Sequence, residues 1–361
     1  MALVKAAVIY GPKNIRVEKR DIPDPGDDEV QVDVSFNGIC GSDIHEYLEG
    51  MDLATVSHPL THMKAPLIPG HEFSGTISQV GKQVSQLKIG DRVAVEPIIA
   101  CGKCPECLSG HYNLCEHSIG TDNAAGFLGF SANGGLAEKC NVKAIFAHRL
   151  PSDFPLDLGA LVEPVSVAAQ AVLESHVSAG DDVLIQGAGP IGLFTALMVK
   201  IAGVHNIIIN DMSKERLDLA KKLGILDTLH AASPRELHEL VYAKTNGRGV
   251  DIAFDCAGVQ PTLAGAIEAL KVGGKVTVIA LFGEPPVVDI RTLLKKGGSL
   301  LTSYGYANKF ERVINIIDNH RELFKQVITK KIKLNGLVSE GIEALAHDKK
   351  QAKILVDMKP D

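Results

Sequence analysis

The segment DDVLIQGAGPIGLFTALMVKIAG, residues 181–203, carries the strongest indication of a fold in this chain. A β-branched run leads into a loop with three glycines, and an apolar helical pattern follows it. This order is typical of a dinucleotide-binding unit, because the glycines let a pyrophosphate approach the free amides at the start of the helix. A bare G-x-G-x-x-G would be a weak signal, and its position between strand and helix makes it a strong one. The predicted cofactor contacts in this loop are Gly187, Gly189, Pro190, Ile191 and Gly192.

A second strand-like run, NIIIND, ends at Asp211, nineteen residues after Gly192. An acid at about this spacing binds the ribose hydroxyls of NAD and would repel the 2′-phosphate of NADP. The sequence therefore favours NAD, and an N-cap role for Asp211 is compatible with it. Lys214 and Arg216 follow on the next predicted helix and weigh slightly against NAD; Arg216 is also a predicted cofactor contact.

Working outward from this segment, strand-like runs alternate with helical patterns from about residue 158 to residue 304. Such alternation predicts βαβ units and a doubly wound parallel sheet. The first 150 residues are instead β-rich, with short runs broken by Gly, Pro and Asp. The C-terminal part is mostly helical, with one strand-like piece at 352–358 that could cover the parallel sheet or return to the first domain. The sequence thus predicts an α/β protein of two domains.

Composition limits the classes of function. A chain of 361 residues corresponds to about two domains, and its 45% hydrophobic and 22% charged content is that of a globular protein. The formal net charge of −6 gives no reason to expect nucleic acid or an anionic membrane as a partner, since either would need a broad basic face. No apolar run approaches the ~20 residues of a membrane span, and the first residues do not resemble a secretory signal. We therefore expect a cytoplasmic protein.

Four of the seven cysteines lie within the stretch CGKCPECLSGHYNLC, residues 101–115, with separations of three, three and eight residues. This density favours metal thiolates over disulfides. An iron–sulfur cluster is the main alternative, but the bacterial ferredoxin pattern places its fourth cysteine sooner and follows it with proline. A site with four protein ligands is closed to substrate, so we predict a structural zinc. Its ligands would be Cys101, Cys104, Cys107 and Cys115.

Three further segments, GICGSDIH, PGHEFSG and ALVEPVS, each carry a weaker signal. Together they offer one thiolate, one imidazole and carboxylates, which is the donor set of a catalytic zinc with one open position. We assign Cys40, His71 and Glu163 as the predicted zinc ligands. Since neighbours on an extended chain point to opposite sides, Glu72 is predicted to support His71 or to exchange with the ligands.

These motifs span nearly the whole chain, and their combination with LVEP and GAGPIG resembles the zinc-containing medium-chain dehydrogenases. Segments such as HEYLEG and GFLGFSANGGLAE look most like the 2,3-butanediol dehydrogenases of that family. The resemblance implies a GroES-like catalytic domain, residues 1–157 completed by 306–361, and a Rossmann domain, residues 158–305. It further implies NAD facing the catalytic zinc in a cleft, and a homodimer or homotetramer.

The resemblance also assigns roles to individual residues. Cys40, His71 and Glu163 match the family's catalytic zinc ligands, and Glu72 matches an adjacent acid; members differ over which glutamate contacts zinc. Ser42 and His45 match positions that relay the alcohol proton to solvent through the nicotinamide ribose. The complete four-cysteine loop weighs slightly against the sorbitol dehydrogenases, since some of them lack it.

The predicted activity is the NAD-linked interconversion of 2,3-butanediol and acetoin, and diacetyl reduction is a further predicted activity. Alternatives within the family are a sorbitol, other polyol or threonine dehydrogenase. A zinc-free enone reductase would not need Cys40, His71 and Glu163. A non-enzymatic zinc and nucleotide sensor would leave that three-ligand group unexplained.

Overall fold

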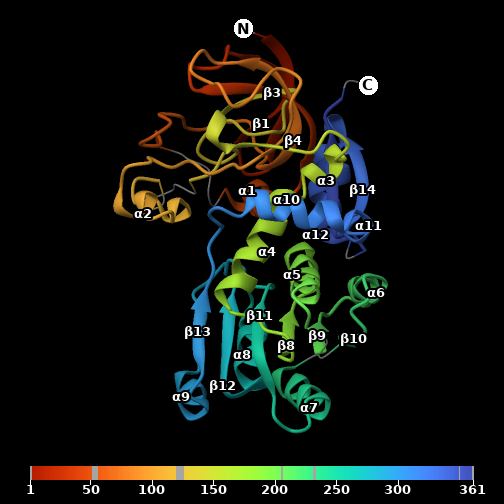
Figure 1. The fold of residues 1–361 in the computed structure, drawn as a ribbon. Coiled ribbons are helices and arrows are strands. Elements are labelled where there is room, and N and C mark those ends of the chain that lie inside the picture. The colour runs from red at the N-terminus through yellow and green to blue at the C-terminus, as the bar shows by residue number, and fades with distance from the viewer. Residues whose placement is uncertain are drawn as a thin grey trace. The chain divides into compact units, whose positions relative to one another are not determined.

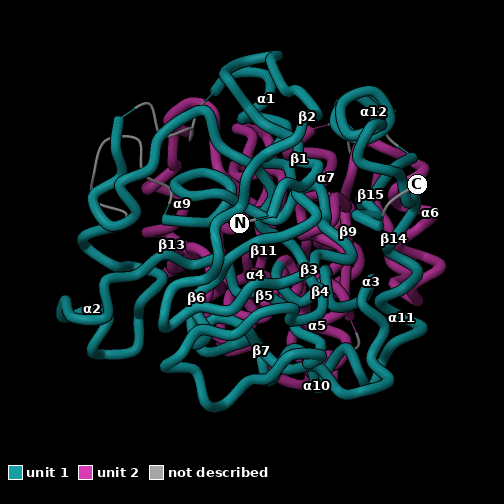
Figure 2. The backbone as a smooth tube through the Cα atoms, turned by 90° about the horizontal axis from the view of Figure 1, so that it is seen from above, with its two compact units in different colours: residues 1–163, 307–361 teal, residues 164–306 magenta. Residues whose placement is uncertain are grey.

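The computed structural model describes residues 2–50, 56–118, 126–204, 206–230, 233–348 and 350–359. The chain forms two compact units, which Figure 2 shows in different colours. The first unit comprises Met1–Glu163 together with Ala307–Asp361, and the second comprises Pro164–Tyr306. The N-terminal and C-terminal parts of the chain therefore share one unit, and the middle of the chain forms the other.

The first unit is built on β-structure. Strands β1 and β2 pair as an antiparallel ribbon, and a mixed sheet of seven described strands has the order β14-β15-β3-β4-β5-β7, with β6 also paired to β3. The strands are β1 (Ala2–Gly11), β2 (Asn14–Ile22), β3 (Glu29–Gly38), β4 (Glu72–Val80), β5 (Arg92–Val95), β6 (Lys139–Lys143), β7 (Ala147–Arg149), β14 (Ile328–Lys333) and β15 (Lys353–Asp357). Their inward side chains form one apolar core, to which Val30, Val32, Ile354 and Val356 contribute.

The C-terminal segment, blue in Figure 1, completes this sheet. The strand-like piece predicted at 352–358 is β15, which pairs antiparallel with β3 so that Leu355 faces Gly38. Strand β14 then adds to β15 in parallel. Between the two alternatives that periodicity left open, the tail therefore joins the first unit.

Short helices connect the strands of the first unit. The α-helices are α1 (Gly41–Glu49), α2 (Pro105–Leu108), α3 (Leu156–Gly159), α10 (Phe310–Asn319), α11 (Arg321–Lys325) and α12 (Glu343–His347). Single turns of other helix types are η1 (Tyr112–Leu114), η2 (Ala144–Phe146), η3 (Leu334–Gly336) and η4 (Leu337–Ile342). Helix α1 begins directly after Cys40, which is its N-cap residue.

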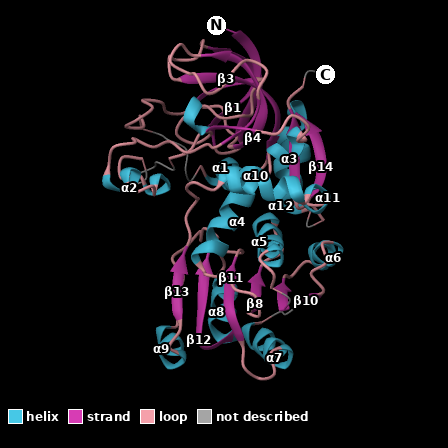
Figure 3. Ribbon diagram, in the orientation of Figure 1, coloured by secondary structure: helices cyan, strands magenta, loops and turns pink. Residues whose placement is uncertain are grey.

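The second unit has a sheet of six described strands, all parallel, in the order β10-β9-β8-β11-β12-β13. Figure 3 shows the arrows of this sheet running in one direction. The strands are β8 (Asp182–Gln186), β9 (Asn206–Asn210), β10 (Asp227–Leu229), β11 (Val250–Asp255), β12 (Leu270–Val278) and β13 (Ser299–Thr302). The order reverses between β8 and β11, and ligands of doubly wound sheets bind beyond the carboxyl ends of the strands at such a point.

The predicted doubly wound sheet is thus confirmed. The helices are α4 (Val162–Glu174), whose first two residues belong to the first unit, α5 (Pro190–Ile201), α6 (Lys214–Lys222), α7 (Pro234–Lys244), α8 (Gln260–Ala269) and α9 (Ile290–Lys296). Apolar residues of α7, α8 and α9 pack against the central strands in one core. Among the described residues, no helix has the length and apolar character needed to cross a bilayer.

Candidate functional site

The four cysteines of the 101–115 loop converge on one point. Their Sγ atoms all lie within 4.8 Å of one another, and those of Cys101 and Cys107 are 3.9 Å apart. Four thiolates bound at about 2.3 Å around a tetrahedral ion would be ~3.8 Å apart. The donor set and its spacing therefore fit a zinc ion.

Backbone amides of this loop point at the sulfur atoms. The amides of Lys103 and Cys104 donate to Sγ of Cys101 at 3.4 and 3.3 Å, and the amide of Cys101 donates to Sγ of Cys115 at 3.3 Å. Burial raises the pKa of Cys101, but the amide donors outweigh it and lower the pKa to about 7. Because metals bind thiolates rather than thiols, these amides favour the metal-binding form of Cys101. Burial raises the pKa of Cys107 to about 12 and also raises that of Cys115, so a cation that binds there must displace their protons.

Tyr112, between the third and fourth cysteines, fastens the loop to the rest of the first unit. Its hydroxyl donates to Oε1 of Glu96 at 2.7 Å and accepts from the amide of Asn308 at 2.7 Å. Glu96 is buried and also bonds to Nε2 of His148 at 2.7 Å. Burial, with Glu96 as the second cause, raises the pKa of Tyr112. No sequence spacing links these residues, so the motif analysis did not find this network.

A second group of potential metal ligands consists of Cys40, His71 and Glu72, whose ligand atoms lie within 4.8 Å of one another. Burial raises the pKa of the Cys40 thiol to about 12, and a cation that binds there must displace its proton. His71 lies one residue before β4. Because His71 is not part of the strand, the alternation of side chains along β4 does not apply to it. The ligand atoms of His71 and Glu72 lie close together, so the expectation that the two side chains point to opposite sides is wrong. A thiolate, an imidazole and a carboxylate fit zinc.

Both ring nitrogens of His71 have polar neighbours. Nδ1 lies 3.8 Å from Oδ1 of Asp43, and Nε2 lies 3.5 Å from Oγ of Ser42. Asp43 is buried, and its other oxygen accepts the amide of Cys40 at 2.9 Å. Burial raises the pKa of Asp43. A carboxylate behind a ligating histidine fixes the ring orientation. Asp43 was assigned no role from the sequence, because its place beside His71 follows only from the tertiary structure.

Glu72 is held by a buried lysine that the sequence analysis missed. Lys353, in β15, donates to Oε1 and Oε2 of Glu72 at 2.8 and 2.7 Å. Burial lowers the pKa of Lys353, but the charges of Glu72 and then Cys40 more than offset it, so the pKa is raised. The only sequence signal was a lysine inside the apolar strand pattern AKILVDM.

The remaining predicted residues of the first unit lie nearby or on its surface. Glu163, the second residue of α4, is buried and interacts electrostatically with Lys353, but it is outside the group of three. Its assignment as a zinc ligand stays a prediction. His45 lies on α1 with a side chain 55% exposed, 4.0 Å from Glu49. That exposure suits exchange of a proton with solvent.

The predicted nucleotide loop connects β8 to α5. Gly187 has φ +95°, a conformation that favours glycine, and a Cβ there would meet Cβ of Ala257 at a tight 3.1 Å. Gly189 is the N-cap of α5, and Pro190 occupies its first turn. The first amides of the helix have no acceptors within it. They are therefore available to a pyrophosphate, and the predicted cofactor contacts stay a prediction.

Asp211 lies directly after β9, beside this loop. Oδ2 accepts the amide of Ala188 at 2.6 Å, and Oδ1 accepts the amide of Ser213 at 2.7 Å. The carboxylate thus joins the glycine loop to the start of α6. Arg216 lies in the first turn of α6, and its Nε is buried without a hydrogen-bond partner among the described residues.

Two glycine substitutions test this loop. Gly192→Ala would place a Cβ 1.8 Å from the carbonyl oxygen of Gly187, and overpacking of this kind costs about 1–3 kcal/mol. We expect the Tm of the variant to fall by ~5 °C. Calorimetry of the purified variant measures this change.

Gly189→Ala is the matched control, because its Cβ would have nothing within 4 Å and its φ is −69°. The Tm should be unchanged, whereas the Kd for NADH should rise about tenfold, or ~1.4 kcal/mol, since the methyl group would occupy the predicted approach of the pyrophosphate. Equal thermal stability of the two variants would contradict the close approach at Gly192. Unchanged NADH binding in Gly189→Ala would contradict the predicted cofactor path.

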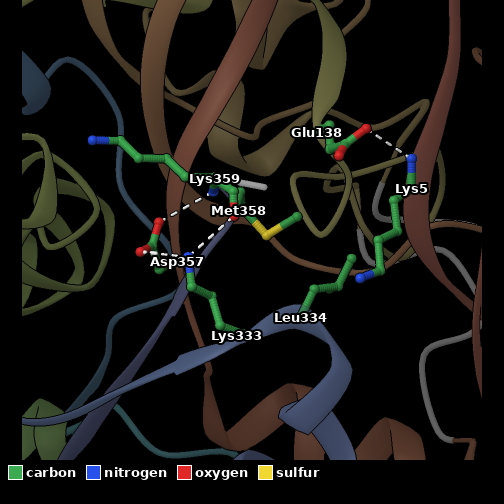
Figure 4. Close-up of a pocket in the computed structure, with 7 residues that line it drawn as sticks. All are labelled: Lys5, Glu138, Lys333, Leu334, Asp357, Met358 and Lys359. Atoms are coloured by element: carbon green, nitrogen blue, oxygen red, sulfur yellow. Dashed lines mark hydrogen bonds and ion pairs between the residues drawn. The ribbon is translucent and has the colours of Figure 1, made fainter. Parts of the chain in front are cut away.

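A surface hollow of the first unit lies apart from both ligand groups (Figure 4). Its polar groups engage one another: Lys333 donates to Oδ2 of Asp357 and to the carbonyl of Lys359, each at 3.2 Å. Glu138 accepts the amide of Lys5 at 2.9 Å. The hollow contains none of the predicted site residues, and we assign no chemistry to it.

Comparison with known proteins agrees with these features. Residues 26–152 match the family model of the alcohol dehydrogenase GroES-like domain, and residues 190–319 match that of zinc-binding dehydrogenases. An (R,R)-butanediol dehydrogenase of Neisseria gonorrhoeae is 36% identical over 98% of this chain and 99% of its own length. A sorbitol dehydrogenase of Bacillus subtilis is 31% identical over 98% of this chain and 97% of its own. The crystal structure of a 2R,3R-butanediol dehydrogenase from Bacillus subtilis superposes with a TM-score of 0.87 at 34% identity, covering 99% of this chain and 100% of that one.

The doubly wound sheet with its glycine loop, joined to a GroES-like unit with metal-ligand groups, defines a zinc-binding oxidoreductase. The chain belongs to the zinc-containing medium-chain alcohol dehydrogenase family. NAD-dependent alcohol dehydrogenase activity follows from this membership, with butanediol dehydrogenases among its similar relatives. Sorbitol dehydrogenase is also similar, so membership leaves the particular alcohol open.

Proposed function

We propose that this enzyme interconverts 2,3-butanediol and acetoin, with hydride transfer to and from NAD, and that it also reduces diacetyl. The observation that carries the chemistry is the buried group of Cys40, His71 and Glu72 in a chain that also has a dinucleotide loop. The substrate rests on similarity: butanediol dehydrogenases reach 36% identity over nearly the full chain, against 31% for sorbitol dehydrogenase.

We further propose two zinc ions per chain. The four-cysteine loop would hold one that supports the fold, and Cys40 and His71 with Glu163 would hold the one that takes part in catalysis. Zinc at the second site would supply Lewis acidity to the substrate oxygen, while the nicotinamide ring would accept hydride from the carbon. The carboxylate of Asp43, 3.8 Å from Nδ1 of His71, would help to orient the ring of a ligating histidine.

The proton of the alcohol would leave through side chains of α1. The hydroxyl of Ser42 lies 3.5 Å from Nε2 of His71. A substrate bound beside that nitrogen would therefore have Ser42 as a neighbour that accepts its proton. His45, whose imidazole is exposed, would pass this proton on to water. In the reverse direction the same groups would return a proton to the forming hydroxyl.

For the cofactor, we propose that Asp211 selects NAD over NADP, because its carboxylate would repel a 2′-phosphate. Asp211→Gly should raise the ratio of kcat/KM for NADP to that for NAD by about tenfold or more, that is ~1.4 kcal/mol. Asp211→Asn is the control that removes the charge but keeps an acceptor for the amides of Ala188 and Ser213. Steady-state kinetics with both cofactors measure the ratio. An unchanged ratio in both variants would show that Asp211 does not select NAD over NADP.

The substrate is tested by NAD reduction with the stereoisomers of 2,3-butanediol, sorbitol, xylitol, threonine and simple secondary alcohols. We expect the highest kcat/KM with one butanediol isomer, and acetoin reduction with NADH in the reverse assay. A clear preference for sorbitol or threonine would change the proposed substrate but not the proposed hydride transfer to NAD. Absence of alcohol oxidation with every member of the panel would refute the proposed function.

We also propose a homodimer or homotetramer. In the described part of the chain, β13 ends the sheet of the second unit with no strand on its outer side. Large apolar side chains in the segment of chain before it are exposed, among them Val287 at 75% and Leu294 at 79%. Exposed edges and apolar patches of this kind are normally covered by another chain. A monomeric mass in sedimentation equilibrium would contradict the proposal.

We propose that the functional domains are residues 1–157 with 306–361, and residues 158–305. A chain with seven cysteines and no disulfide among those described fits a reducing compartment, and we propose that it acts in the cytoplasm. Fractionation of cells that express the protein tests the location.

A further inference from the structure

Lys353 is among the most deeply buried side chains of the first unit, with 1% of its surface exposed. Its Nζ donates to both carboxylate oxygens of Glu72 and, at 3.0 Å, to the carbonyl oxygen of Ile39. These three acceptors match the three protons of an ammonium group. Glu72 itself has no exposed surface. The lysine is therefore fully bonded in a place where a charge without partners would be strongly unfavourable.

The surrounding strands are built to accept this pair. Gly38 in β3 pairs with Glu72 in β4 and with Leu355 in β15. A Cβ at position 38 would lie 2.0 Å from Oε2 of Glu72. The carboxylate thus occupies space that exists only because residue 38 has no side chain. The C-terminal strand brings Lys353 to that space from the far end of the sequence.

The pair adjoins the proposed catalytic zinc site on two sides. Glu72 is one of the three residues whose ligand atoms lie within 4.8 Å of one another, and Ile39 directly precedes Cys40. Cys40, Glu72 and Glu163 would contribute three negative charges, and the two positive charges of a zinc ion there would balance two of them. Lys353 interacts electrostatically with all three of them. Its single positive charge would balance the third.

We propose that Lys353 is a positioning residue for the catalytic metal: it holds Glu72 beside the site as a paired carboxylate and prevents that carboxylate from becoming an additional metal ligand. This rests on the proposed function, which places zinc at Cys40 and His71. A ligand position that Glu72 does not occupy stays open to the substrate oxygen. Lys353 thereby sets both the charge and the coordination number of the site.

The charges predict opposite effects of two substitutions on zinc affinity. Lys353→Met removes a positive charge and frees Glu72, so the chelator concentration that strips the catalytic zinc should rise at least about tenfold. Glu72→Gln leaves the lysine charge unbalanced, so that concentration should fall by a similar factor. In the double variant both charges are gone, and the affinity should return close to that of the wild type. If the role of Lys353 were purely structural, both single substitutions would weaken zinc binding.

Cobalt(II) exchanged into the site gives a readout independent of activity, because its visible absorption weakens as coordination number rises. The absorption should drop in Lys353→Met and be retained in Lys353→Arg, which keeps the charge. The KM for the alcohol should rise in Lys353→Met, with the Kd for NADH unchanged. Lys330→Met is the matched control, since this lysine of the adjacent strand β14 pairs with Glu340 on the surface at 3.1 Å. It should match the wild type in each measurement.

If Lys353→Met does not fold, a comparison of Glu72→Gln with the double variant still tests the proposal. The double variant should fold, because removal of both partners leaves no unpaired charge of this pair in the interior. The proposal requires the double variant to bind zinc more tightly than Glu72→Gln. Equal or weaker binding by the double variant overturns it, as do shifts of the same sign in the two single variants. Failure of the proposed function is distinct: the wild type would then oxidise no alcohol in the panel or bind no zinc that depends on Cys40.

Discussion

Cys40→Ser is expected to lower kcat/KM for alcohol oxidation by at least a thousandfold. Its thiolate is the predicted anionic ligand from the N-cap of α1, and no other described cysteine belongs to the group that includes His71. A Lewis acid contributes several kcal/mol to a reaction of this kind, and about 4 kcal/mol corresponds to a thousandfold in rate. Initial rates of NAD reduction and the zinc content, expected to fall from two to one per chain, measure the effect.

NADH binding should survive this substitution, because the glycine loop and Asp211 belong to the second unit and do not depend on Cys40. Cys140→Ser is the matched control: Cys140 is also buried in the first unit but donates only to backbone carbonyls, those of Asn133 and Asn141 at 3.7 Å. The control should keep its zinc and its activity. A Cys40→Ser enzyme within tenfold of the wild-type rate would exclude Cys40 from the catalytic site.

Cys115→Ser is expected to destabilise the protein rather than to change its chemistry. Cys115 is fully buried, and its Sγ lies with those of the three other loop cysteines. Structural zinc contributes on the order of 10 kcal/mol to the folding of small zinc domains. For a folding unit of the size of the first one, a loss of about 4 kcal/mol would lower the Tm by ~10 °C. Differential scanning calorimetry and metal analysis measure these changes.

Zinc removal supplies the control for Cys115→Ser. If the cysteine acts through the metal, a chelator should lower the Tm of the wild type by about as much as the substitution does. It should add little to the variant, because effects that share one interaction are not additive. The folded variant should keep its kcat, since the Cys40 group is separate from the loop. An unchanged Tm together with full zinc content would refute the structural role.

Local sequence was sufficient to predict a site wherever its residues lie close together along the chain. The four cysteines fall within fifteen residues, and the loop brings their sulfur atoms within 4.8 Å of one another. The glycine loop likewise lies between one strand and one helix, so its conformation follows from adjacent residues. Both were predicted from spacing, and both are formed in the structure.

The group of Cys40, His71 and Glu72 is different, because its members come from separate segments that a sheet must bring together. Spacing could suggest the donor types, but it could not show which glutamate lies beside Cys40. Side-chain alternation was the wrong guide at His71, which lies outside the strand that begins at Glu72. Asp43 and Lys353 were missed for a related reason: their roles depend on neighbours and burial.

The amino-acid sequence thus established the parallel nucleotide-binding unit, the four-cysteine site and the family, since each depends on short-range pattern or on similarity along the chain. The tertiary structure established that the C-terminal tail joins the first sheet and that Lys353 meets Glu72 across 281 positions. Partners so distant are selected by strand pairing and by the requirement that a buried charge find its counter-charge. Neither leaves a local pattern around position 353.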